Sequence, residues 1–497
     1  MGSARRATAC LTIALLFVCA DAACIVGPKY VKPAVPTPPS YKEIEAPAVS
    51  GEWKHAEPQD QAARGRWWET FNDAQLNELE ARLDVSNQTI AAAAATVQMA
   101  RARVRGARAQ YYPVVTAAPS IMNARIATGF GTTLGITYTN YSLPIEASWE
   151  PDLWGRVRNT VKSSTFAAQA SVADLEAVRL SAQSELASDY YELRAQDTLR
   201  QLLDAAVDAY QEAFDLTYDR YVAGLESDQA VALAETQLKT TRAEMTSLGV
   251  LRAQYEHAIA VLCGEPPSAF SLAAQALPGR PPDVPVGIPS ELLERRPDVA
   301  AGERAVAQAN AQIGIAQSAF YPVVALSATL GFQNLTPADW LTWPSRIWSL
   351  GPSLVQTIFD GGSRRATVEQ VQAGYDQVVA NYRQTVLTAF QQVEDNLAAL
   401  RILARVLDQE NDAIASAERS LEDANVRYQS GLDSYLSVIV AQTALLNLQQ
   451  AAVNTRAQQM VAAVQLIKAL GGGWDATQIP TEQALGRNPP KGSNKTK

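Results

Sequence analysis

The chain repeats itself once over its 497 residues, and this duplication limits the folds available to it more than any other feature. The segment AQYYPVV at 109–115 recurs as SAFYPVV at 318–324. Farther along, RYVAGLES at 220–227 recurs as RYQSGLDS at 427–434, so the landmarks keep their order at an offset of 207 to 209 residues. Self-similarity at a nearly fixed offset indicates two copies of one structural unit.

The duplication sets the expected domain organisation. We place the first repeat at 61–264 and the second at 298–472, and the segment 265–297 between them contains eight prolines, as a linker does. Each repeat is expected to hold a helix, two short strands and a long helical hairpin, in that order. The predicted fold class is α+β and mainly α.

The longest helices are expected in these hairpins. No proline occurs from Gly155 to Tyr221 or from Asp360 to Leu470, and a helix of about 65 residues is about 100 Å long. From 432 to 467, mainly apolar residues recur at alternating steps of four and three, which predicts a coiled-coil seam. Gly224 and Gly431 fall where the chain must reverse, because glycine readily adopts the left-handed conformation that ends a helix. The tips are therefore expected near these two glycines.

Two regions, about 114–150 and about 323–359, lose the helical period and alternate between apolar and polar residues. Apolar residues with aromatics at both ends of a strand, opposite a polar face, are typical of a barrel strand with lipid outside and water inside. We expect two strands in each region. The residues predicted to face lipid are Tyr141, Leu143, Ile145, Trp149, Leu326, Leu330, Phe332 and Trp348.

Four strands cannot close a barrel, and an open sheet edge is not tolerated in lipid. Several copies of the chain must then contribute strands to one barrel, and three copies would give twelve strands, enough for a water-filled lumen. The alternative is a small soluble sheet that packs its apolar face on a helix.

The N-terminus predicts export. Residues 1–23 combine Arg5 and Arg6 with an apolar run and small residues, as a secretory signal peptide does. Cys24 follows two alanines, as the lipidated cysteine of a bacterial lipoprotein does, and acyl chains there would hold the N-terminus at a bilayer. The proline-rich segment 24–60 is expected to be an extended tether rather than a packed element, and the tail 473–497 to be disordered or loosely draped.

Composition and motifs argue against several function classes. A net charge of −9 gives no general basic field for nucleic acid, and two histidines leave little room for imidazole metal sites. The sequence contains no Gly-x-Ser-x-Gly elbow and no clustered metal ligands. We predict no enzyme activity, no metal and no cofactor beyond a covalent lipid on Cys24.

Several stretches resemble one known family. These are WWETFNDAQLNEL, KALGGGW and, most specifically, ELLERRPDVAAGERAVAQANAQIGIAQSAFYPVV. From Cys24 to about Trp474 the chain resembles the TolC-like outer-membrane factors of tripartite efflux systems, in the lipoprotein branch called NodT-type. The resemblance implies a homotrimer with a twelve-stranded outer-membrane barrel that continues as an α-helical coiled-coil tunnel through the periplasm.

The same resemblance implies a function. The chain would be a passive, lipid-anchored channel in the outer membrane, conducting drugs or other small toxic molecules. A periplasmic adaptor and an inner-membrane pump of the resistance–nodulation–division type would deliver them. Two alternatives stay open: an exit duct for type I protein or siderophore secretion, and a periplasmic coiled-coil structural lipoprotein without a pore.

The resemblance also assigns roles at the hairpin tips. The adaptor-contacting positions would be Gly224 with Leu225 and Gly431 with Leu432.

A periplasmic aperture is implied beside these tips. Arg427 and Tyr428 match a pair that lines it in the relatives. The family's acidic partners lie six and nine residues after the tip glycine, where this sequence has Ser437 and Val440, so the nearby carboxylates Asp228, Glu226 and Asp433 are the candidates instead. We hypothesise that Arg427 pairs with a carboxylate of a neighbouring hairpin when the channel is closed, so that Arg427→Ala raises single-channel conductance.

Overall fold

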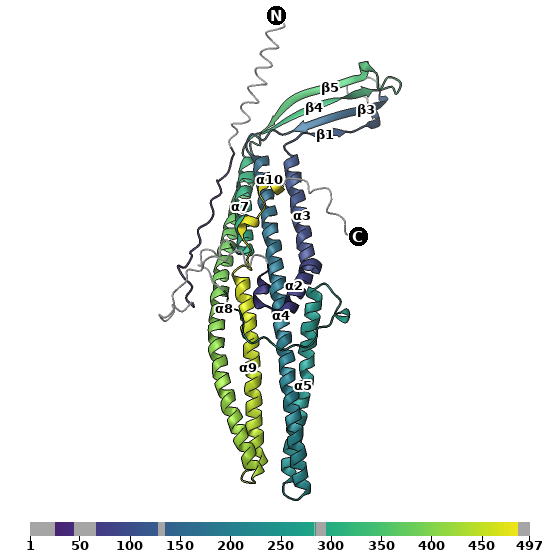
Figure 1. The fold of residues 1–497 in the computed structure, drawn as a ribbon. Helices are drawn as coiled ribbons and strands as arrows, with labels where there is room; N and C mark the ends of the chain where they lie inside the picture. The colour runs from purple at the N-terminus through teal and green to yellow at the C-terminus, as the bar shows by residue number, and fades with distance from the viewer. Residues whose placement is uncertain (1–24, 44–65, 128–134, 283, 285–294, 486–497) are drawn as a thin grey trace.

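The computed structural model describes residues 25–43, 66–127, 135–282, 284 and 295–485. The predicted signal peptide and Cys24 lie outside the described residues. Within them, the molecule is elongated, with a sheet at one end of a helical bundle and two hairpin tips at the other (Figure 1).

The duplication is visible in the lengths of the helices. Each repeat contains a 22-residue helix, a 67-residue helix and a 35-residue helix, in that order. In the first repeat these are α3 (Gln88–Ala109), α4 (Arg156–Val222) and α5 (Asp228–Leu262), and in the second they are α7 (Pro297–Ser318), α8 (Ser363–Gln429) and α9 (Tyr435–Ala469). Two short elements precede α3 within the first repeat, η1 (Trp67–Phe71) and α2 (Ala74–Ser86).

Both hairpins reverse as the glycines predict. Gly224 and Gly431 have φ values of 74° and 72°, in the left-handed region. Leu225 N–H donates to Arg220 O at 2.8 Å and Leu432 N–H donates to Arg427 O at 2.9 Å. These bonds satisfy carbonyls that a helix end would otherwise leave free.

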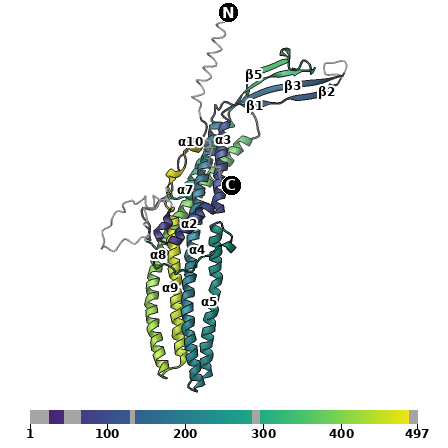
Figure 2. The same cartoon turned by 45° about the vertical axis from the view of Figure 1, so that its right-hand side comes forward.

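The short helix of each repeat stacks on the end of the hairpin's second helix. The Asn87 amide, at the start of α3, donates to Leu262 O at the end of α5 at 2.9 Å. In the second repeat the Arg296 guanidinium, before α7, donates to Ala469 O at the end of α9 at 3.0 Å. Each repeat therefore presents two nearly continuous helical columns, and α4 lies centrally against α3, α5, α7 and α9 (Figure 2).

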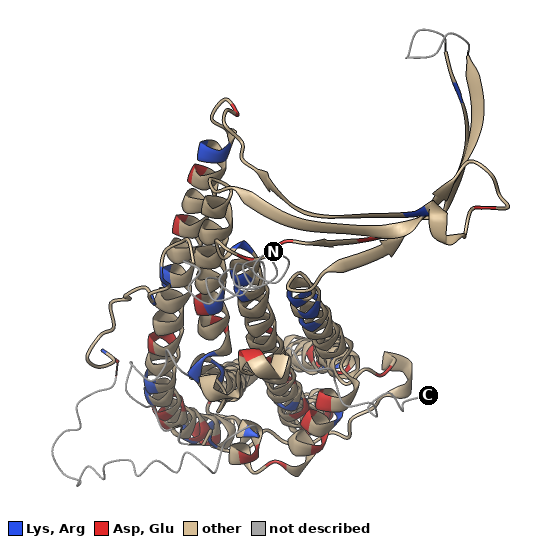
Figure 3. Ribbon diagram, turned by 90° about the horizontal axis from the view of Figure 1, so that it is seen from above, with Lys and Arg blue, Asp and Glu red and all other residues tan. Residues whose placement is uncertain are grey.

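The strands form one antiparallel sheet in the order β1–β3–β4–β5, with β2 also paired to β3. Their bounds are β1 Val114–Ala117, β2 Ser120–Ile126, β3 Ile136–Trp149, β4 Val323–Asn334 and β5 Arg346–Val355, with η3 (Trp343–Ser345) before β5. Seen from the sheet end, the helices form an open arc and the sheet curves away to one side (Figure 3).

The first predicted strand is broken into β1 and β2. The break, at Ala118 and Pro119, lies opposite Leu143 and Pro144 of β3. Neither proline can donate a ladder hydrogen bond, so regular pairing is interrupted at this point. Four strands were predicted. The described chain has five strand segments, because β1 and β2 together take the place of the first predicted strand.

The prediction of an unpacked tether is wrong for residues 25–43. This segment is extended but lies against α4, α7 and α8, where Tyr41 is buried in a cluster with Val299 and Val386. The side-chain amides of Asn159 and Asn310 donate to Val26 O and Pro28 O at 2.9 and 3.0 Å. The prolines correctly indicated extended backbone, but its carbonyls still bind neighbouring side chains.

The prediction of a disordered tail is likewise wrong for residues 474–485. Trp474 is buried against Ala173 and Ala301, and Leu485, in α10 (Glu482–Leu485), is buried against Val104. Apolar side chains in this polar stretch hold it across the helices. We call residues 474–485, including η4 (Ala476–Gln478), the C-terminal strap.

The described part of the predicted linker is also docked. Leu272 and Leu277, after η2 (Pro267–Ala269), are buried in the cluster around α4. The wholly buried Arg194 of α4 forms an ion pair with Asp197 at 2.8 Å and donates to the linker carbonyl Ala273 O at 2.8 Å.

Candidate functional site

The sheet has one apolar and one polar face. In an antiparallel pair, directly opposed residues point to the same side. The register pairs Ile145 with Leu330 and Leu330 with Trp348. The residues predicted to face lipid all lie in β3, β4 and β5, and they share this face. They are Tyr141, Leu143, Ile145, Trp149, Leu326, Leu330, Phe332 and Trp348.

The apolar face is uncovered in the single chain. Leu330 is 63% exposed and Trp348 is 73% exposed. On the other face Glu146 opposes Thr329, which opposes Ser349. A soluble sheet would place its apolar face on the helices, whereas Figure 1 shows the sheet extending away from them. This arrangement suits lipid on one side and water on the other.

Aromatic side chains gather at both ends of the strands. At the end far from the helices, Tyr141 packs on Trp340, with ring centroids 5.6 Å apart, and Arg346 stacks on Trp343. At the helix end, the Trp149 indole donates to Tyr111 O at 2.9 Å. Such belts are typical of the two interfaces of a bilayer.

Among the described residues, the two edges of the sheet have no pairing strand; they are formed by β1 and β2 on one side and by β5 on the other. Unpaired backbone groups inside a membrane cost several kcal/mol each, so these edges require partner strands. A further copy of the chain offers the complementary edge.

At the opposite end of the molecule, the tips expose apolar side chains. Leu225 is 71% exposed and Leu432 is 74% exposed, each directly after its turn glycine Gly224 or Gly431. Asp228 is exposed in the first turn of α5.

In the single chain, Arg427 pairs across the turn of its own hairpin, and its predicted pairing in the closed trimer stays a prediction. Its Nε donates to Asp433 Oδ2 at 3.4 Å, across the turn. The pKa of the Asp433 carboxyl is lowered, first by the Ser434 backbone N–H and then by the Ser437 hydroxyl, with Arg427 contributing less. The turn brings Asp433 within reach of Arg427, which is why the pair forms locally.

Tyr428 is buried between the two hairpins of one chain, and is not an exposed lining residue there. It is 4% exposed, and its hydroxyl donates to Glu226 Oε2 of the first tip at 3.2 Å. The Arg220 guanidinium lies 4.8 Å from its ring centroid, and Tyr435 packs on it. Burial raises the pKa of Tyr428.

We did not predict the part played by Arg220. The sequence repeat could have indicated a role for Arg220 at the tips, because it aligns Arg220 and Tyr221 with Arg427 and Tyr428. The first of these arginines holds the two tips together by stacking on Tyr428.

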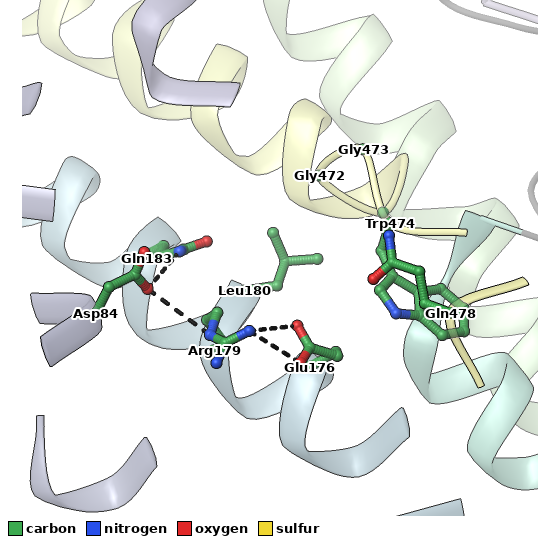
Figure 4. A pocket seen from close by; sticks show the side chains of 10 residues that line it. Asp84, Glu176, Arg179, Leu180, Gln183, Gly472, Gly473, Trp474 and Gln478 are labelled. Carbon is green, nitrogen blue, oxygen red and sulfur yellow. Dashed lines mark hydrogen bonds and ion pairs between the residues drawn. The ribbon is translucent and has the colours of Figure 1, made fainter. Parts of the chain in front are cut away.

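A cavity of about 180 Å³ lies between α4 and the turn after α9 (Figure 4). Its Arg179 pairs with Glu176 at 2.8 Å and with Asp84 at 3.7 Å, so its charges are satisfied internally. Pockets that hold drug-sized ligands are about 300–1,000 Å³. In the described part of the chain, no group of three or more His, Cys, Asp or Glu side chains could hold a metal ion. A second hollow of about 370 Å³, between α8 and α9 near the second tip, is wide open to solvent and does not enclose a ligand. The path for cargo is therefore sought in the assembly.

Comparison with known proteins agrees with this geometry. The model of the outer membrane efflux protein family matches residues 79–265 and 288–472. The chain is 30% identical over 465 residues to the probable efflux pump outer membrane protein TtgC of Pseudomonas putida, covering 91% of this chain and 96% of that one. It is 29% identical over 438 residues to the pyoverdine export outer membrane protein OpmQ of Pseudomonas aeruginosa, covering 86% and 92%.

A solved structure shares the fold. The outer-membrane channel OprN superimposes with a TM-score of 0.83 at 28% identity, covering 91% of this chain and all of that one.

The amphipathic sheet with unpaired edges, the long helical hairpins and these matches define a class: trimeric outer-membrane channels whose barrel continues as a helical tunnel into the periplasm. The chain belongs to the outer membrane efflux protein family and is an outer-membrane efflux channel. This family consists of channels and not of enzymes.

Proposed function

We propose that the channel receives drugs and other small toxic molecules from an inner-membrane pump of the resistance–nodulation–division type, through a periplasmic adaptor that binds the hairpin tips. The observation that carries the proposal is the pair of exposed leucines, Leu225 and Leu432, at the end farthest from the sheet. Exposed apolar side chains at equivalent places on two tips suit a protein partner.

The test is complementation of a strain that lacks the gene. Leu225→Asp with Leu432→Asp should abolish the resistance that the wild-type gene restores, because a charge would be buried in the adaptor contact. The matched control, Leu225→Met with Leu432→Met, keeps the apolar surface and should complement fully. Full resistance with the aspartate variant, present as trimer, would contradict the proposal.

The tips also form the periplasmic aperture in this proposal, with Arg427, Asp433 and Asp228 narrowing the tunnel. The Arg427–Asp433 contact fixes the tip geometry and supports this role. Arg427→Ala should raise single-channel conductance in planar bilayers, and Arg419→Ala, an exposed cation two turns earlier on α8, should leave it unchanged. An unchanged conductance in Arg427→Ala would contradict the role.

A second candidate cargo is a siderophore, favoured by the similarity to OpmQ, which is named for pyoverdine export. The two candidates separate in the deletion strain. Loss of resistance to dyes and antibiotics with normal secreted siderophore supports the first, and the reverse supports the second.

Cys24 is proposed to carry the lipid anchor. The next residue, Ile25, lies against Gly155, where an added Cβ would come within 3.0 Å of Ile25 Cγ2, and Val26 N–H donates to Trp154 O at 3.1 Å. Both contacts lie between the end of β3 and the start of α4, at the membrane end of the helices. Mass spectrometry of the mature N-terminal peptide should find acyl chains on Cys24, and an unmodified thiol would contradict the anchor.

A further inference from the structure

The upper half of α3 carries an unusual concentration of positive charge. Between Asp84 and Glu146 the sequence contains five arginines and no acidic residue. Three of them, Arg101, Arg105 and Arg108, follow the i, i+4, i+7 spacing that places side chains on one helix face. We call these three residues the arginine face.

Most of this charge is not neutralised within the chain. Among the described residues, Arg101 and Arg105 form no ion pair, and the buried Nε of Arg101 has no hydrogen-bond partner. Arg108 alone is held, since it donates to Glu482 O at 2.9 Å and lies 3.6 Å from the Glu482 carboxylate of the C-terminal strap.

The duplication shows which way this face points. At an offset of 209 residues, Arg101 corresponds to Asn310 of α7 and Arg105 to Gly314. Asn310 donates to Pro28 O, and Gly314 lies close to both α4 and the N-terminal segment, because an added Cβ would come within 2.4 Å of Asn159 Nδ2 and 2.9 Å of Val26 O.

A conducting tunnel has to keep its lumen open, so the face covered by the terminal segment is the outer one. The arginine face is the equivalent surface of α3, and no described part of the chain covers Arg101 and Arg105 in the same way.

The upper end of the arginine face lies near the height expected for the lipid headgroups. Arg108 lies six residues before Val114, where β1 begins, and the exposed Tyr112 lies between them. Arg101 is about 10 Å below Arg108 along the helix. A headgroup layer of about 5–7 Å borders the hydrocarbon, and long arginine side chains can reach up into it. Seen from the sheet end, Lys and Arg occur at the near ends of several helices (Figure 3).

We propose that Arg101, Arg105 and Arg108 form a binding surface for anionic phospholipid headgroups in the periplasmic leaflet of the outer membrane. Charge complementarity selects the lipid class, because a guanidinium binds phosphate through paired N–H donors. The surface would hold phosphatidylglycerol around the base of the barrel. This inference does not depend on the cargo or on the pump.

The test measures lipid that stays bound to the full-length trimer. The channel is reconstituted in phosphatidylethanolamine mixed with phosphatidylglycerol, re-extracted in mild detergent and analysed by native mass spectrometry. Wild-type protein should be enriched in phosphatidylglycerol relative to the bulk mixture. Arg105→Gln should lower that enrichment about fivefold, and Arg101→Gln with Arg105→Gln further, because each cation near an anionic surface has about that effect.

The matched control is Arg103→Gln on the other flank of the same helix. Arg103 is exposed, and it lies on the far side of the buried residues Val104 and Ala107 from Arg105 and Arg108. It should leave the enrichment unchanged. An equal loss in Arg103→Gln, or no loss in Arg105→Gln, would overturn the proposal.

The competing occupant is the neighbouring subunit. If the arginines pair with its carboxylates, the double variant should lose trimer while the remaining trimer keeps its enrichment, which would overturn the lipid proposal. If the variants fail to assemble, the phosphatidylglycerol enrichment of the wild-type protein is measured over a series of NaCl concentrations. Enrichment that falls as NaCl rises supports the proposal, and enrichment insensitive to salt overturns it.

Discussion

The helices α3 and α7 occupy equivalent places in the two repeats and are equal in length, yet their outer faces differ. On α7 the face with Asn310 and Gly314 is covered by the chain's own N-terminal segment. On α3 the same positions are Arg101 and Arg105, which make no ion pair within the described chain. The same helical unit thus lies in two different environments, and the side chains on its outer face differ accordingly.

The long helices α4 and α8 also carry different charges at equivalent positions. On α4 the positions 185, 189 and 192 are acidic, whereas on α8 the equivalents are Gln392, Asn396 and Ala399. At the tips, the equivalent tyrosines also differ, because Tyr428 is buried and Tyr221 is exposed. The duplication fixes element lengths and turns, and charge is distributed independently in each repeat.

The largest expected effect comes from freeing the N-terminal segment from the second repeat. Tyr41→Ala should lower the free energy of unfolding by about 3 kcal/mol, because it empties a buried aromatic site against α7 and α8. Denaturant unfolding of the purified channel measures this. Val31→Ala, at an exposed position of the same segment, should change it by less than about 0.5 kcal/mol. Equal effects would contradict a docked segment.

A smaller effect is expected from a single methyl group under that segment. Gly314→Ala places a Cβ 2.4 Å from Asn159 Nδ2 and should cost about 1–3 kcal/mol by overpacking. Gly106→Ala, on α3, meets nothing within 4 Å and should be neutral or stabilising by up to about 1 kcal/mol. Thermal unfolding of the two variants compares the helices directly, and a stabilised Gly314→Ala would refute the close contact.

The acidic stretch of α4 predicts that the stability of the channel depends on pH. Burial, with Glu185 and Glu192 nearby, raises the pKa of Asp189 to about 6. A raised pKa means that the folded state holds the proton more tightly, so stability present below about pH 4 is lost as pH rises through about 6. After allowance for solvent screening of this partly exposed group, the loss is about 1 kcal/mol.

Asp189→Asn should therefore stabilise the channel at pH 7 and have little effect at pH 4, measured by thermal unfolding at both values. Asp204→Asn, at an exposed position of the same helix, should show no such difference. A pH response unchanged by Asp189→Asn would assign the effect to another group.

The smallest effect is expected at the tips. Tyr428→Phe removes the hydrogen bonds to Glu226 and Thr217 and should cost about 0.5–1 kcal/mol. Hydrogen exchange of α8 and α9 near the tip should then quicken. Tyr221→Phe, at the equivalent exposed position, should leave exchange as in wild type. Equal changes would show that the two tyrosines are not distinguished by burial.

Periodic features of the fold could be predicted from the sequence. The glycine turns at 224 and 431 and the alternation in β3 are local patterns, and each dictates its element without distant contacts. The apolar face was also predictable, since strand register follows the alternation that buries or exposes one whole side.

Features that depend on contacts between residues far apart in the sequence could not be predicted. Proline-rich composition correctly indicated extended backbone at 25–43, but the docking of Tyr41 depends on helices more than 250 residues away. The C-terminal strap gives little local signal, because Trp474 and Leu485 are the only buried residues among the described residues 474–485. By contrast, Asp433 was among the candidate carboxylates, and it pairs with Arg427 in the single chain because the local turn brings the two together.

The central claim is that three copies close the amphipathic sheet into one barrel above the helical tunnel. Electron microscopy of the full-length protein in lipid nanodiscs tests it most directly. The account predicts a threefold tube about 130 Å long, from a 67-residue helix of about 100 Å and a barrel about one bilayer core tall, with β5 of one copy beside β1 and β2 of the next. A particle with one copy, or with the apolar face of the sheet folded onto helices, would contradict it.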